Sequence, residues 1–153
     1  MKKYLILFLF VIIGCVSGFS QKVTVTKPSV AELISVLDSK KPVLTLDQVA
    51  AKNGFKLSSQ GYGLYKYVKF INSSSKIYID MKLLNNGLAN HVLINSNTKS
   101  VVDSWASQLI KLGYVLERSE GDGFEKRWYY SRPAGYSISI GKMGTEYDLC
   151  IIR

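Results

Sequence analysis

The chain has 153 residues, and its 20 lysines and arginines outnumber its 11 acidic residues, which gives a formal net charge of +9 at pH 7. This length is sufficient for one domain with its own hydrophobic core. Two cysteines exclude a framework of several disulfides, and the single histidine confines any histidine-dependent chemistry to one position.

The first twenty residues have the layout of a secretory signal peptide. Two lysines precede an apolar run over residues 4–13, and small residues follow it. That run is shorter than the roughly 20 apolar residues of a membrane-spanning helix. Cleavage after Ser20 is expected to release a periplasmic or secreted protein. The sequence Ile-Ile-Gly-Cys that ends at Cys15 also resembles a lipoprotein box, so an outer-membrane lipoprotein acylated at Cys15 is the alternative.

Residues 21–43 are expected to form an N-terminal segment with one short helix. Ser29 is followed three residues later by Glu32, which is a capping-box pattern. Apolar residues at helical spacing continue to Leu37. The sequence Lys-Lys-Pro over residues 40–42 is expected to end this helix.

Residues 44–95 and 96–153 are predicted to be two tandem repeats, because the pattern of 44–95 recurs without a gap 59 positions later. A helix opens each repeat, capped at Thr45 in the first and spanning residues 99–112 in the second. Gly54 and Gly113 are expected to end these helices. Four alternating strand segments follow each glycine: 55–58, 64–71, 76–84 and 89–95, then 114–119, 124–131, 136–142 and 146–152.

The order of elements predicts an α+β fold, a single pseudo-symmetric domain with the helices on one face of antiparallel sheet. Short connections favour antiparallel meanders. Trp105 lies on the apolar stripe of the second helix and is expected to pack against the sheet.

The sheet face opposite the helices is the predicted binding surface. Strand alternation and the repeat assign aromatic and basic side chains to it. Residues 44–95 contain six lysines and two acidic residues, which indicates an anionic partner or surface. We expect a protein or an anionic envelope component; nucleic acid is not expected after export, and a membrane only if Cys15 is acylated. The predicted partner-binding residues are Lys66, Phe70, Tyr78, Lys82, Arg127 and Tyr129.

No catalytic residue, cofactor or metal site is predicted. A nucleophilic pair would require His91 to meet Cys150, and we interpret them as a partly exposed strand histidine and a small buried thiol. Metal-ligand spacings are missing from the sequence. The acidic residues over 117–125 flank glycines and are interpreted as a solvated hairpin tip.

This arrangement resembles that of the β-lactamase inhibitory protein and its relatives, in which a helix-loop-helix followed by a four-stranded antiparallel sheet is duplicated. The resemblance rests on residues 29–37, on 45–54 and on the eight alternating segments. It implies a non-catalytic, inhibitor-like binding module, and no functional residues are carried over. A duplicated curved sheet of the TATA-binding-protein type is an alternative topology. A lipid-anchored structural accessory protein of the bacterial outer envelope is the alternative function.

Overall fold

The structure is a computed structural model that describes residues 28–62, 66–75, 77–133 and 135–153. Its helices are α2 (Val30–Asp38), α3 (Pro42–Lys52) and α4 (Lys99–Lys111). Its strands are β1 (Lys56–Tyr62), β2 (Lys66–Asn72), β3 (Ile77–Leu83), β4 (Ala89–Ser96), β5 (Val115–Gly121), β6 (Glu125–Ser131), β7 (Ser137–Met143) and β8 (Glu146–Ile152). The predicted signal peptide and Cys15 lie outside the described residues.

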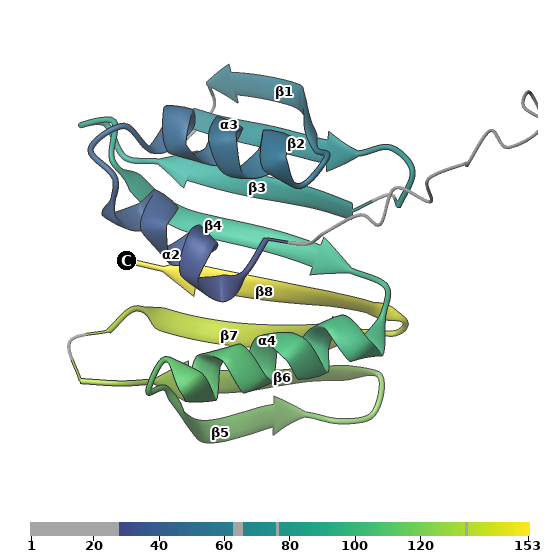
Figure 1. The fold of residues 1–153 in the computed structure, drawn as a ribbon. Helices are drawn as coiled ribbons and strands as arrows, with labels where there is room; N and C mark the ends of the chain where they lie inside the picture. Colours follow the sequence, from purple (N-terminus) through teal and green to yellow (C-terminus); the bar gives the residue numbers. More distant parts are fainter. Residues whose placement is uncertain (1–27, 63–65, 76, 134) are drawn as a thin grey trace, which may run out of the picture.

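The eight strands form one antiparallel sheet in the order β1-β2-β3-β4-β8-β7-β6-β5. All three helices cover the same face of it (Figure 1). The predicted combination of helices and antiparallel sheet is therefore confirmed. No helix within the described ranges is long and apolar enough to cross a membrane.

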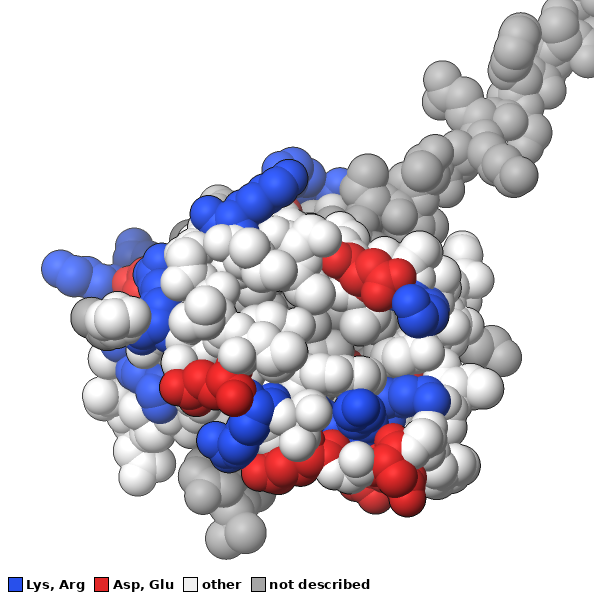
Figure 2. Space-filling model, turned by 90° about the horizontal axis from the view of Figure 1, so that it is seen from below, with Lys and Arg blue, Asp and Glu red and all other residues white. Residues whose placement is uncertain are grey.

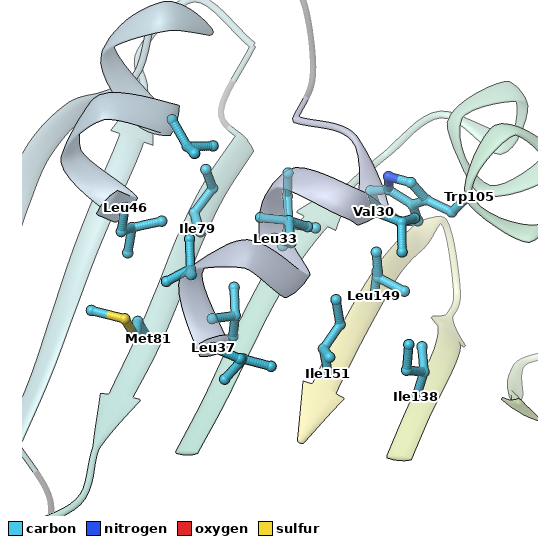
Figure 3. Packing of buried hydrophobic residues seen from close by; sticks show 14 of the residues in the cluster. Val30, Leu33, Leu37, Leu46, Ile79, Met81, Trp105, Ile138, Leu149 and Ile151 are labelled. Atoms are coloured by element: carbon cyan, nitrogen blue, oxygen red, sulfur yellow. The ribbon is translucent and has the colours of Figure 1, made fainter. Parts of the chain in front are cut away.

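Helix α2 covers the middle of the sheet. Its predicted capping box is confirmed, because the Ser29 hydroxyl accepts from the Glu32 amide and the Glu32 carboxylate accepts from the Ser29 amide. Val30, Leu33 and Leu37 are fully buried. Figure 3 shows these three side chains pointing onto the seam between β4 and β8.

Helix α3 starts three residues before the predicted cap at Thr45. Pro42 occupies the first turn, and Lys41 is the N-cap residue. A proline ring suits that position because the first-turn amides have no partner inside the helix. The Thr45 hydroxyl donates instead to the Ser39 hydroxyl at 2.7 Å. Lys41 and Pro42, which were expected to end the first helix, thus cap and begin the second one.

The core fills the space between the helices and the sheet. Trp105 of α4 is 1% exposed, which confirms its predicted burial, and it lies beside Val30 of α2 and Leu149 of β8 (Figure 3). Helices α3 and α4 are followed by Gly54 at φ 75° and Gly113 at φ 83°. This left-handed conformation favours glycine, as predicted for a helix C-terminus.

Candidate binding surface on the uncovered sheet face

None of the described elements covers the sheet face opposite the three helices, and we call it the open face (Figure 1). Along β3, buried residues alternate with half-buried or exposed ones, which separates the two faces. Directly opposite residues of paired strands point to the same face, so the strand registers assign the residues of the other strands to the two faces as well. The open face carries Tyr67, Lys69, Tyr78, Asp80, Lys82, His91, Leu93, Asn95, Arg118, Glu120, Arg127, Tyr129, Ser139, Gly141, Asp148 and Cys150.

Four of the six predicted partner-binding residues lie on this open face: Tyr78, Lys82, Arg127 and Tyr129. The prediction is wrong for Phe70, which is 2% exposed and faces the helices beside its cross-strand partner Ile79. Lys66 is directly opposite Leu83 and has the same parity as Phe70. Neither residue can therefore belong to a patch that includes Tyr78.

The error comes from a one-residue difference between the two hairpins that open the meanders. Leu57 pairs with Phe70 in the first hairpin, whereas Leu116 pairs with Tyr130 in the second. The first members of these pairs are 59 residues apart, but the second members are 60 apart. A shift of one residue moves every side chain of a strand to the other face. Phe70 thus corresponds to the buried Tyr130 and not to Tyr129.

An ion pair between Arg127 and Asp148 crosses the open face of strand β7. The guanidinium donates to both carboxylate oxygens, at 3.1 and 3.2 Å, and to the Ser139 hydroxyl at 2.9 Å. Gly141 lies beneath the pair. A Cβ at that glycine would be 2.5 Å from the Asp148 carboxylate and 2.6 Å from the Arg127 guanidinium. Glycine therefore allows this ion pair to lie flat across the sheet.

Tyrosine rings on the open face are held by cations on neighbouring strands. The Arg118 guanidinium lies 4.1 Å from the centroid of the Tyr129 ring, whose hydroxyl donates to Glu120 at 3.1 Å. Hydrogen bonds from Arg118 and Tyr129 lower the pKa of the Glu120 carboxyl. On the other meander, the Lys69 ammonium lies 4.0 Å from the centroid of the Tyr78 ring. A cation on a neighbouring strand thus holds each ring in place.

The centre of the open face brings His91 of β4 against Cys150 of β8, with 3.7 Å between Nε2 and Sγ. The amino-acid sequence alone does not indicate this contact, because it leaves the order of the strands open. Burial raises the pKa of the Cys150 thiol to about 11, and Asp148 adds to that effect. Burial and nearby Lys82 lower the pKa of His91. Both groups are therefore neutral at pH 7, and the thiol is not activated as a nucleophile.

The charge around the β5 edge of the molecule is of mixed sign. Figure 2 looks onto the molecule from the β5 side, and acidic and basic side chains alternate there along the lower margin. A groove of about 340 Å³ lies among these charges at the end of β5 to β8, with Glu120, Glu125, Lys126 and Arg127 in its lining. No group of three or more His, Cys, Asp or Glu in the described part of the chain could hold a metal ion.

Comparison with known proteins supplies no relative for this chain: no family model, curated protein or solved structure matches it. The open-face residues that sequence analysis missed are Asp148, Arg118, Glu120 and Gly141. Each of these residues is recognised as part of the surface only by the residue opposite it on the neighbouring strand. Which residues are opposite follows from the strand order.

Proposed function

We propose that the protein is an exported, non-catalytic binding module that holds a protein partner on its open face. The observation that carries this proposal is the set of pre-oriented tyrosine and arginine side chains on that face. Tyrosine and arginine are enriched among residues that dominate protein interfaces. Side chains already fixed by Arg118, Glu120 and Asp148 lose little conformational entropy on binding.

The size of the open face suits a macromolecule better than a small ligand. Tyr78 on β3 and Tyr129 on β6 are separated by four strand spacings, or about 19 Å. An ordinary protein interface buries roughly 800 Å² on each partner and spans such a distance. Paired charges of both signs favour a protein surface with its own paired charges over a purely anionic polymer.

We also propose that the two meanders are tandem repeats, with an inhibitor-like mode of binding as in the family that the sequence resembles. Support comes from the strand order, in which β1 to β4 are mirrored by β5 to β8. The first hairpin of each meander has a one-residue register shift, between Leu57 and Ser59 in one and between Leu116 and Arg118 in the other. Both meanders follow a helix that ends at a left-handed glycine.

Export rests on the amino-terminal sequence, and we propose cleavage after Ser20. A lipid-anchored accessory of the outer envelope is the second candidate, favoured by the lipoprotein-like box at Cys15. The intact mass of the native protein distinguishes cleavage after Ser20 from acylation of Cys15. Export without a lipid requires a mature chain that begins at Gln21, whereas an acyl-modified Cys15 would replace that proposal with the anchored one.

The binding proposal is tested with Tyr78→Ala and Tyr129→Ala combined in one variant, and with the partner recovered by gentle crosslinking of the native protein. Loss of both aromatic anchors should weaken binding at least about tenfold. Ile110→Ala is the matched control, because Ile110 is an exposed side chain on α4, on the opposite side of the sheet. A folded double variant that binds normally would rule out the open face as the interface.

A further inference from the structure

A groove of about 540 Å³ lies on the helix side of the sheet, between α3 and the hairpin of β1 and β2. We call it the α3 groove. Its lining includes Val68 and Phe70, which are buried, so the groove reaches the hydrophobic core. Val43, Leu44 and Leu57 also line it, and they are 38%, 52% and 53% exposed. An apolar cavity with an apolar, solvent-exposed rim is suited to an elongated apolar ligand.

Positive charge gathers where α3 begins. Lys40 and Lys41 line the groove there, and they outnumber the acidic lining residue Asp47. Among the described residues, the ammonium groups of the two lysines form no hydrogen bond, ion pair or ring contact. The N-terminus of α3 has no side-chain cap, and the helix dipole adds partial positive charge at this end. An anionic head group would therefore find unpaired cations beside the apolar lining.

A second groove, of about 420 Å³, lies between α4 and strands β6 to β8. Its cations are already engaged. Lys99 forms an ion pair with Asp103 at 3.1 Å, Lys126 lies over the ring of Trp128, and Lys142 donates to a backbone carbonyl in the β5–β6 turn. This difference between the grooves selects the α3 groove as the site for an anion.

We propose that the α3 groove binds a single-chain anionic amphiphile, a carboxylate on an alkyl chain. The alkyl chain lies along Leu44, Leu57 and Phe70, and the carboxylate is placed beside Lys40 and Lys41. The volume of the groove falls within the range of roughly 300 to 1,000 Å³ for small-molecule sites. This site lies on the helix side, so it is independent of binding at the open face.

Dodecanoate, below its critical micelle concentration, is the probe for this site. Calorimetric titration of the protein should give one saturable site, and amide resonances of β1, β2 and α3 should shift. Dodecyltrimethylammonium has the same chain with a positive head group, and it should bind at least about tenfold more weakly because the lysines repel it. Hexanoate should also bind more weakly, because it buries less apolar surface.

Three variants assign the contacts. The first variant is Leu57→Gln, and the second combines Lys40→Gln with Lys41→Gln. Each should weaken dodecanoate binding at least about fivefold. Leu116→Gln is the matched control, because Leu116 is 52% exposed at the corresponding position of the second hairpin. It should leave the affinity unchanged. The proposal is overturned if dodecanoate shows no saturable binding, if the cationic amphiphile binds equally well, or if Leu116→Gln is as damaging as Leu57→Gln.

Discussion

His91 reports directly on the electrostatics of the open face, because it is the single histidine of the chain. Burial disfavours its charged form, Lys82 disfavours it further, and Asp80 and Asp148 oppose both effects. The pKa of His91 should therefore lie below its ordinary value of about 6.5. Proton NMR titration of the imidazole resonance measures it. Lys82→Gln should raise the pKa, and Asp80→Asn should lower it; a midpoint above 6.5 in the unmodified protein would contradict this placement.

Gly141 illustrates a requirement that only the folded sheet reveals. A methyl group at this position would collide with both members of the Arg127–Asp148 ion pair. Gly141→Ala should therefore displace these two flexible side chains and break their partly exposed ion pair, which should lower the free energy of unfolding by at most about 1 kcal/mol. Urea unfolding measures this loss. Gly123→Ala is the control, because no atom lies within 4 Å of the added methyl group; equal losses in the two variants would show that the ion pair is not responsible.

At the scale of elements, hydrophobic spacing and capping predicted α2, α4 and the strand segments, because those signals depend on neighbours in the chain. The start of α3 was missed because Lys-Lys-Pro was interpreted as a helix end, although proline is equally compatible with a first turn. The side chains of β2 were assigned to the wrong sheet face, because an ungapped repeat cannot detect that the register of one hairpin differs from the other by one residue. The His91–Cys150 contact required the pairing of β4 with β8 as well, and the Arg127–Asp148 contact required the registers of β6, β7 and β8.

Trp105 is the largest fully buried side chain that α4 contributes to the core. Trp105→Ala should lower the free energy of unfolding by about 3 to 5 kcal/mol, because a large cavity would remain between α4 and the sheet. Chemical denaturation monitored by circular dichroism measures the change. A loss below about 1 kcal/mol would mean that α4 does not pack on the sheet through this residue.

At the scale of the whole molecule, one sheet is covered on one face and left free of described elements on the other. Strands β1 and β5 are the two edges, and each has a register irregularity near its start. Bulges of this kind discourage edge-to-edge pairing with other chains. This protection of the edges agrees with the proposal that a partner binds the broad open face.

Site-specific photocrosslinking in the native host tests that central claim most directly. A photoreactive phenylalanine analogue is placed at Tyr78 or Tyr129 on the open face, and at Ile110 on the helix side as a control. The proposal places both tyrosines in one interface, so the two open-face positions should give the same protein adduct after irradiation, and Ile110 should give none. An adduct formed from Ile110 alone, or no adduct from either tyrosine position, would contradict the assignment of the open face as the binding surface.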